Sequence, residues 1–262
     1  MGKVAIVTGG TSGIGLETLL ALEKAGVTAY ALSRHPAEGV KNHVVCDVSD
    51  EASVRLAVGE VIRREKRVDI LVNCAGFGIS GAVEYTDPAE ARRQIDVNLF
   101  GTDRVNRAVL PVMRAQGGGR IVCVSSVAAV APIPFQAWYS VSKAGINALV
   151  MAMSNEVKSF GVSVCAVMPG DIKTGFTAAR QKSSAGDEAY GGRIARSVEK
   201  MERDERGGMS AAFAGEKIAR IALGRRVRPY YALGAGYKAC CALIKLLPAG
   251  AARRIIGLLY GG

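Results

Sequence analysis

The chain has 262 residues, 49% of them hydrophobic, which suits one α/β domain whose sheet is covered on both faces. No apolar run approaches the ~20 residues of a membrane-spanning helix, and Val4–Val7 is too short for a signal-peptide core, so a cytoplasmic location is expected. The six cysteines lack metal-ligand spacing and the two histidines lie outside any nucleophile motif, which argues against a metal site and Ser/His/Asp hydrolysis.

The formal net charge of +11 is unevenly distributed along the chain. Residues 1–192 hold 20 basic and 18 acidic side chains, whereas residues 193–254 hold 14 basic and 5 acidic ones. In Arg193–Arg203 the two signs alternate at helical spacing, which is typical of a solvated helix face. Since no nucleic-acid-binding module is recognisable either, no nucleic-acid partner is expected.

The first predicted strand, residues 3–8, runs into a glycine cluster, Gly9–Gly15, and then into an amphipathic helix, residues 13–25. Glycines at this point allow a tight turn and a close backbone approach to a pyrophosphate, and the helix N-terminus supplies N–H groups and a positive dipole end. This order of strand, glycine turn and helix indicates dinucleotide binding.

Strands and helices alternate along the rest of the chain, which predicts a single Rossmann-type domain with a doubly wound parallel sheet of about seven strands and helices on both faces. Ligands of such a sheet bind beyond the carboxyl ends of its strands. The predicted strands are residues 3–8, 28–33, 43–46, 69–73, 120–125, 162–168 and 228–233. The predicted helices are residues 13–25, 50–66, 88–115 and 139–160.

Tyr139 and Lys143 stand four residues apart on the helix predicted over 139–160, and therefore on one helix face. An ammonium beneath a phenol favours the phenolate, so the spacing predicts a lowered pKa for Tyr139 and a general acid/base near neutral pH. Ser126 lies thirteen residues upstream, at the end of the strand predicted over 120–125.

Over residues 3–180 the chain resembles the short-chain dehydrogenase/reductase family in five segments that follow the family's order. These are Thr8–Gly15, Asn73–Gly76 with Cys74 as a mild departure, Asp96–Gly101, the set Ser126, Tyr139 and Lys143, and Pro169–Thr174. The resemblance implies the catalytic residues Asn98, Ser126, Tyr139 and Lys143 and no metal. The cofactor-binding candidates are Gly9, Thr11, Ser12, Gly13, Ile14, Gly15, Ser33, Arg34, Asp47, Val48, Asn73, Ala75, Gly76, Tyr139, Lys143, Pro169, Gly170, Ile172 and Thr174.

The resemblance also implies a role for each catalytic residue. Tyr139 would exchange a proton with the substrate oxygen, and Lys143 would lower its pKa and hydrogen-bond the nicotinamide ribose. Ser126 would polarise the reacting oxygen. Asn98 would hold a water that links Lys143 to solvent. Ser125 is the neighbouring alternative to Ser126, with its side chain expected to face the other way.

Ser33 and Arg34 follow the second predicted strand, where enzymes selective for NAD place a carboxylate for the ribose 2′-hydroxyl. A guanidinium and a hydroxyl suit a 2′-phosphate instead, so the sequence predicts a preference for NADP(H). Ser12 stands where many NADP-using relatives carry an extra basic residue, which leaves dual use open. Asp47 and Val48 match the family's adenine-contacting pair.

Residues 98–174 resemble the branch of the family that contains 17β-hydroxysteroid and retinol dehydrogenases. This implies an apolar alcohol or ketone substrate that is steroid-, retinoid- or lipid-like. One alternative is a 3-oxoacyl thioester reductase, whose acidic carrier protein could bind the basic residues 193–228. An alternative of another class is a catalytically silent NADP(H)-binding sensor, against which the intact Ser126, Tyr139 and Lys143 argue.

Two segments lie outside the predicted core of this single domain, residues 1–262. Residues 175–212 are polar and glycine-rich, and the resemblance implies a mobile substrate lid there. Residues 236–262 form an apolar helical extension with interspersed lysines and arginines, which could dock on the domain, cap the cleft, pack on another subunit or lie on a lipid surface. Docking and subunit packing are favoured over peripheral membrane contact.

Family members pair through two long helices, here 98–115 and 139–160, which implies a homodimer or homotetramer.

Overall fold

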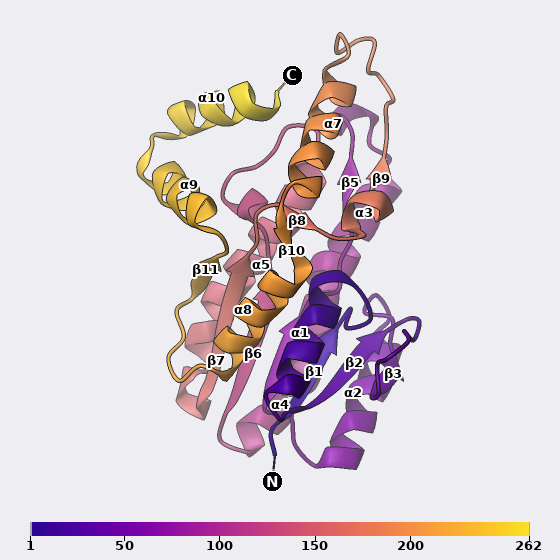
Figure 1. The fold of residues 1–262 in the computed structure, drawn as a ribbon, viewed down its shortest axis with the longest axis vertical. Helices are drawn as coiled ribbons and strands as arrows, with labels where there is room; N and C mark the ends of the chain where they lie inside the picture. Colours follow the sequence, from indigo (N-terminus) through magenta and orange to yellow (C-terminus); the bar gives the residue numbers. More distant parts are fainter. Residues whose placement is uncertain (1, 262) are drawn as a thin grey trace.

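A computed structural model, which describes residues 2–261, has a seven-stranded parallel sheet at its centre (Figure 1). The strand order is β11-β7-β6-β4-β1-β2-β3, and every neighbouring pair is parallel. The strands are β1 (Val4–Thr8), β2 (Thr28–Ser33), β3 (His43–Val45), β4 (Ile70–Asn73), β6 (Gly119–Val124), β7 (Val162–Met168) and β11 (Tyr230–Ala232). This confirms the predicted doubly wound α/β fold.

Helices cover both faces of the sheet, as expected when every strand is followed by a crossover. The helices of the core are α1 (Gly13–Lys24), α2 (Glu51–Glu65), α3 (Pro88–Ile95), α4 (Gly101–Ala115), α5 (Ala137–Glu156) and α8 (Ala211–Leu223). Along β1, Val4 and Ile6 belong to the hydrophobic cluster that contains α2, α4 and α5, whereas Ala5 and Val7 belong to the cluster that contains α1 and α8. The alternation of side chains along a strand thus supplies two cores from one apolar run.

The helix predicted over 88–115 contains one π-helical turn, Asp96–Phe100, between α3 and α4. Such turns are rare and occur frequently at functional sites. Asn98 lies in this turn and is fully buried. The extra residue in the turn therefore points an amide side chain into the interior, near the carboxyl end of the sheet.

The segment predicted as a lid folds against the core through two small parallel sheets. In one, β9 (Gln181–Lys182) pairs with β5 (Ile79–Ser80), and in the other β10 (Met209–Ser210) pairs with β8 (Ile172–Lys173). Along the chain, α6 (Phe176–Ala179) lies between β8 and β9, and α7 (Arg193–Arg206) lies between β9 and β10. Figure 1 shows α7 rising above the carboxyl end of the sheet.

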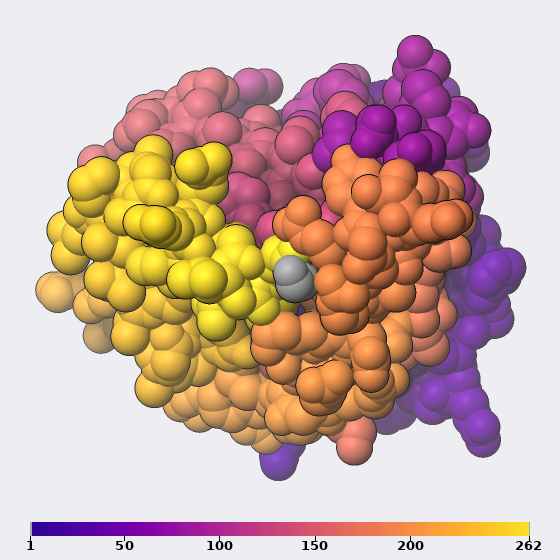
Figure 2. All heavy atoms as spheres, turned by 90° about the horizontal axis from the view of Figure 1, so that it is seen from above, coloured from indigo at the N-terminus to yellow at the C-terminus, as the bar shows by residue number. Residues whose placement is uncertain are grey.

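The C-terminal extension forms two helices, α9 (Ala235–Leu246) and α10 (Ala249–Tyr260), beside the upper end of the sheet (Figure 1). Seen from above, these two helices in yellow lie opposite α7 in orange (Figure 2). Across residues 2–261, no helix has both the length and the apolar character to cross a membrane.

Candidate active site

The turn between β1 and α1 is built from glycines that other residues could not replace. Gly9 has a φ of +63°, in the left-handed region, and a Cβ on Gly15 would lie 2.2 Å from the Gly9 carbonyl oxygen. Ser12 precedes α1 in an extended conformation and makes no side-chain cap hydrogen bond. The turn therefore leaves the first N–H groups of α1 without a side-chain acceptor, and these residues fit a bound pyrophosphate.

Thr8, which the sequence analysis named only as the first residue of the Thr8–Gly15 segment, joins this turn to the end of β4. The backbone N–H groups of Cys74 and Ala75 both donate to Thr8 Oγ1, at 3.1 Å each. The Thr8 side chain therefore fixes the spacing between two strand ends at the mouth of the predicted dinucleotide site.

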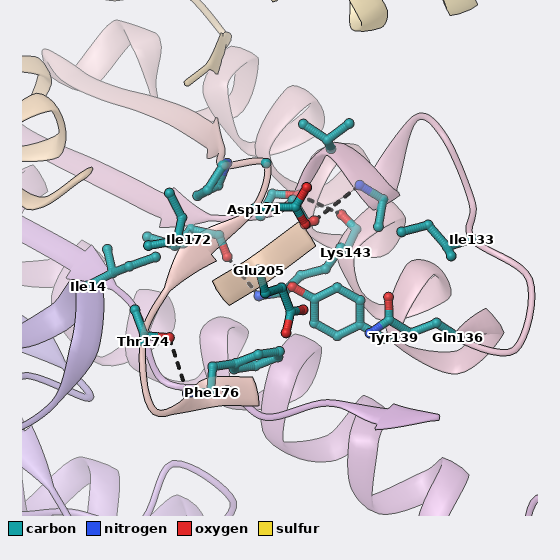
Figure 3. Close-up of a pocket in the computed structure, with 18 of the residues that line it drawn as sticks. Ile14, Ile133, Gln136, Tyr139, Lys143, Asp171, Ile172, Thr174, Phe176 and Glu205 are labelled. Carbon is teal, nitrogen blue, oxygen red and sulfur yellow. Dashed lines mark hydrogen bonds between the residues drawn. The ribbon is translucent and has the colours of Figure 1, made fainter. Parts of the chain in front are cut away.

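A cavity of about 830 Å³ extends from the glycine turn along the carboxyl ends of the strands (Figure 3). Most of the predicted site residues line it, although they come from five separate segments of the chain. The predicted residues in its wall are Gly9, Ser12, Gly13, Ile14, Gly15, Ala75, Gly76, Ser126, Tyr139, Lys143, Pro169, Gly170, Ile172 and Thr174.

Tyr139 and Lys143 project from the first turns of α5 into this cavity. Lys143 Nζ lies 5.7 Å from the centre of the Tyr139 ring and donates to the Val124 carbonyl oxygen at 2.9 Å. Ser126 follows β6, and its Oγ accepts from the Ala128 N–H at 3.1 Å, which holds the side chain in place. Three of the four predicted catalytic side chains thus meet at one wall of the cavity.

Burial changes the pKa values of both groups in opposite directions. Burial raises the pKa of Tyr139 to about 12, and a hydrogen bond with Ser126 offsets this only in part. Burial also lowers the pKa of Lys143 to about 8. The pKa of Tyr139 is therefore raised and not lowered as predicted, because loss of hydration of the phenolate outweighs the favourable charge of Arg180. Lys143 makes no resolved contribution to this pKa, and the negative charges of Glu205 and Asp171 raise it further.

Ser125 and Asn98 both bond within the protein. Ser125 Oγ donates to the Lys143 carbonyl oxygen at 3.0 Å, which agrees with the expectation that its side chain faces away from the reacting position. The Asn98 amide donates to the Phe77 carbonyl oxygen and to Ser142 Oγ, and its Oδ1 accepts from the Phe77 N–H. Asn98 thereby braces the loop after β4 against α5 from outside the cavity wall.

The residues predicted to bind the adenosine end gather after β2 and β3, outside the cavity. Thr11 Oγ1 donates to Ser33 Oγ at 3.0 Å, which links the glycine turn to the end of β2. Hydrogen bonds from Ser49, together with the positive charges of Arg34 and Arg93, lower the pKa of Asp47. Val48 follows Asp47 and packs against Gly101. Arg34 itself is exposed.

Asn73 is a further predicted cofactor-binding residue that does not line the cavity. Its side chain is buried and donates to Asn106 Oδ1 at 2.8 Å, on the α4 side of the sheet. Because side chains alternate across a strand, the last residue of β4 points into the helix layer, while the next residue, Cys74, lines the cavity.

Four cavity residues were not predicted. Phe176, Glu205 and Tyr237 lie in segments that carry no recognisable motif, and Asp171 is a variable position of the Pro169–Thr174 segment. The Phe176 ring lies 5.7 Å from that of Tyr139, and Figure 3 shows Glu205 beside the same tyrosine. Asp171 follows the Pro169–Gly170 segment and accepts a hydrogen bond from Tyr237. Burial raises the pKa of Asp171. Only the spacing of Asp171 from Pro169 could have signalled any of these positions in the sequence.

Comparisons with known proteins agree with this geometry. A family model described as short chain dehydrogenase matches residues 3–185. Over 223 residues the chain is 38% identical to 3-ketodihydrosphingosine reductase of Bacteroides thetaiotaomicron, covering 84% of this chain and 83% of the relative. Over 188 residues it is 34% identical to the 3-oxoacyl-acyl-carrier-protein reductase FabG of Thermotoga maritima, covering 67% and 76%. A solved short-chain dehydrogenase from Streptomyces avermitilis is similar with a TM-score of 0.82 at 28% identity, covering 91% and 90%.

Proposed function

The chain belongs to the short-chain dehydrogenase/reductase family, and we propose that it uses NADP(H) to interconvert an alcohol and its ketone or aldehyde on an apolar, lipid-like substrate. One observation carries this proposal. Tyr139, Lys143 and Ser126 meet at the wall of a cavity that begins at the glycine turn after β1.

The proposed chemistry divides the work among these side chains. NADP(H), when bound, supplies or accepts the hydride. Tyr139 is neutral at neutral pH, since its pKa is raised to about 12, and a neutral phenol suits the donation of a proton to a carbonyl oxygen. Ser126 holds that oxygen by hydrogen bonding. The Lys143 ammonium, 5.7 Å from the centre of the tyrosine ring, stabilises the phenolate that remains on Tyr139 once its proton has moved to the substrate oxygen. Asn98 supports this arrangement by fixing the neighbouring loop.

The far end of the cavity favours a long apolar substrate. Beyond Tyr139 the wall is formed by Ile133 and by side chains of α9 and α10, among them Ile244, Ile256 and Leu259. A wall of this kind stabilises an alkyl chain or a ring system by burying its apolar surface. The relative named as a 3-ketodihydrosphingosine reductase supports a long-chain ketone over the steroid and retinoid candidates.

Replacing Tyr139 with phenylalanine tests the proposed chemistry. We expect Tyr139→Phe to lower kcat at least about a hundredfold, the lower range for loss of a general acid, with NADPH affinity changed by less than about twofold. The assay follows NADPH oxidation with 3-ketodihydrosphingosine, a ketosteroid, a retinal and a 3-oxoacyl thioester in parallel. Retention of more than about a tenth of the wild-type kcat would contradict the role of Tyr139.

A second candidate function is reduction of a 3-oxoacyl thioester on an acidic carrier protein. The similarity to FabG of Thermotoga maritima favours it, and the basic residues 193–228 supply a complementary surface. Turnover of the thioester at a higher kcat/KM than the other three substrates would select this function. Binding of NADPH without turnover of any of the four would instead support a cofactor-binding sensor.

The preference for NADP(H) is proposed from Arg34, whose exposed guanidinium lies beyond the end of β2 near Ser33. A charge-assisted hydrogen bond to a 2′-phosphate contributes about 1.5–3 kcal/mol, so Arg34→Ala should reduce the kcat/KM ratio of NADPH to NADH about tenfold to a hundredfold. Arg55→Ala, at an exposed position of α2, is the matched control. If wild-type protein uses NADH at least as well as NADPH, the interpretation of Arg34 is wrong.

A further inference from the structure

Helices α9 and α10 each present apolar side chains on two sides, inward to the cavity and outward to solvent. On α9 the exposed positions Ala239, Ala242, Leu243 and Leu246 recur at spacings of three and four residues and so share one helix face. Leu246 on α9 and Leu258 on α10 are each 83% exposed. No other large hydrophobic side chain in residues 2–261 is as exposed as these two.

The inward side of the same helices already has a structural explanation. Ile244 and Ile256 line the cavity that contains Tyr139, and both also line a second, apolar groove of about 500 Å³ between the helix pair and residues 130–134. The outward leucines contribute to neither wall. Their exposure therefore has no role in forming the site, and it is costly in water unless a partner covers it.

The charge of the helix pair is of one sign. Residues 235–260 contain four basic side chains, Lys238, Lys245, Arg253 and Arg254, and no aspartate or glutamate. All four are exposed. Exposed leucines flanked by basic residues on short helices match the composition of segments that lie in the interface of an anionic lipid bilayer.

The helix pair also stands at the opening of the site. Tyr260 at the end of α10 donates to Asp204 of α7 at 3.2 Å, and Lys200 of α7 lies 5.3 Å from the Tyr260 ring centre. Figure 2 shows the pair and α7 facing each other across the upper end of the molecule. A surface that covered the outward leucines would thus lie beside the rim of the cavity.

We propose that α9 and α10 form a docking surface for an anionic phospholipid bilayer, with Leu246 and Leu258 inserted among the lipids and the four basic side chains at the headgroups. Docking would bring the apolar groove and the cavity mouth to the lipid, so that a lipid-like substrate reaches Tyr139 without crossing water. This last step rests on the proposed function, whereas the docking itself does not.

A second copy of the chain is a weaker candidate for covering these leucines. The exposed face of α5, formed by Val141, Ala144, Ala148, Met151 and Ala152, offers a flat apolar stripe with no charged side chain for subunit packing. The helix pair instead carries its leucines among four like charges, which would face each other across a twofold interface and repel.

Binding of the full chain to vesicles tests the proposal. Wild-type protein should float with vesicles of phosphatidylglycerol and phosphatidylcholine, and much less with phosphatidylcholine alone or at high salt. We expect Leu246→Ser/Leu258→Ser to reduce the vesicle-bound fraction about tenfold, because two inserted side chains are lost. The matched control is Leu56→Ser, because Leu56 is a leucine on another helix, α2, and is 72% exposed.

The readouts separate docking from folding and from catalysis. NADPH affinity and Tm of the double variant should match those of the wild type, since neither leucine lines the site. Unchanged flotation of the double variant, or equal loss in Leu56→Ser, would overturn the proposal. So would conversion of a dimer to monomers by the double substitution in sedimentation without lipid. Vesicle binding by a protein that reduces none of the four carbonyl substrates would leave docking intact and refute the proposed function instead.

Discussion

At the scale of single residues, the proposed acid and its lysine neighbour share an environment that acts on them in opposite ways. Burial disfavours whichever form is charged, so it raises the pKa of Tyr139 and lowers that of Lys143. The Tyr–Lys spacing was visible in the sequence, but the depth of the site was not. The Phe176 ring, which packs beside the phenol, comes from a segment that carries no motif.

The lowered pKa of Lys143 predicts that the stability of the free protein depends on pH. Between the folded pKa of about 8 and the unfolded value of 10.5, the unfolded chain binds the additional proton, so stability rises with pH. From about pH 8 to pH 9 the free energy of unfolding of the wild type should rise by on the order of 1 kcal/mol relative to that of Lys143→Met. Urea unfolding of both proteins at each pH measures the difference.

The comparison with Lys143→Met is needed because other groups titrate above this window. Burial raises the pKa of Cys46 to about 11 and that of Cys74 to about 12, and each of these shifts makes stability fall as pH rises above about 9. The Cys46 shift is present in both proteins and cancels in the difference. The Cys74 shift includes a contribution from the Lys143 charge, and so the difference is compared below about pH 9, before either thiol titrates in the unfolded chain. A difference that stays constant from about pH 7 to pH 9 would show that Lys143 is not buried as described.

At the scale of elements, the sequence did not predict how the segment 175–212 is attached to the rest of the domain. Its glycines and polar residues predict a mobile lid, whereas in the structure two-residue strands attach it to the core and an ion pair joins two parts of the segment to each other. Strands this short leave no periodic pattern, and their partners lie about a hundred residues away or on a separate loop. The ion pair joins Arg180, whose side chain is fully buried, to Glu205 at the end of α7.

We predict that this ion pair holds α7 against the preceding part of the proposed lid. Thr177 also donates to Glu205, at 2.6 Å, so Glu205 connects α7 to the segment before it. Arg180→Met leaves a buried carboxylate without its cation and should destabilise the protein by about 3–5 kcal/mol in urea unfolding. The double variant Arg180→Met/Glu205→Met removes both charges and should recover much of that loss.

An exposed pair on the same helix provides the control for this experiment. Arg203 and Glu199 of α7 are each 68% exposed, and Arg203→Met should change the unfolding free energy by less than about 1 kcal/mol. Equal effects of Arg180→Met and Arg203→Met would mean that the buried pair contributes nothing particular to the lid.

At the scale of the whole molecule, the sequence pattern predicted the strands of the core closely, but it did not predict where the C-terminal helices lie. The strand predicted over 162–168 has those bounds in the structure, because a buried strand between two helix layers is an almost unbroken apolar run. For α9 and α10 the sequence left four placements open. Their direction depends on contacts such as that of the Tyr237 ring with Gly170, where any added Cβ would collide with the ring.

The exposed face of α5 suggests how subunits assemble. The stripe from Val141 to Ala152 contains no exposed acidic or basic side chain; the nearest, Glu156, stands at the end of the helix. Small residues such as Ala144 and Ala148 let two such helices approach closely, so we propose that α5 packs against its counterpart in a homodimer or homotetramer. Ala148→Glu would place like charges at that contact, and sedimentation equilibrium should show a shift to monomers. Leu56→Glu adds the same charge at an exposed site on α2 and should leave the mass unchanged. An Ala148→Glu protein that keeps the wild-type mass would exclude α5 from the interface.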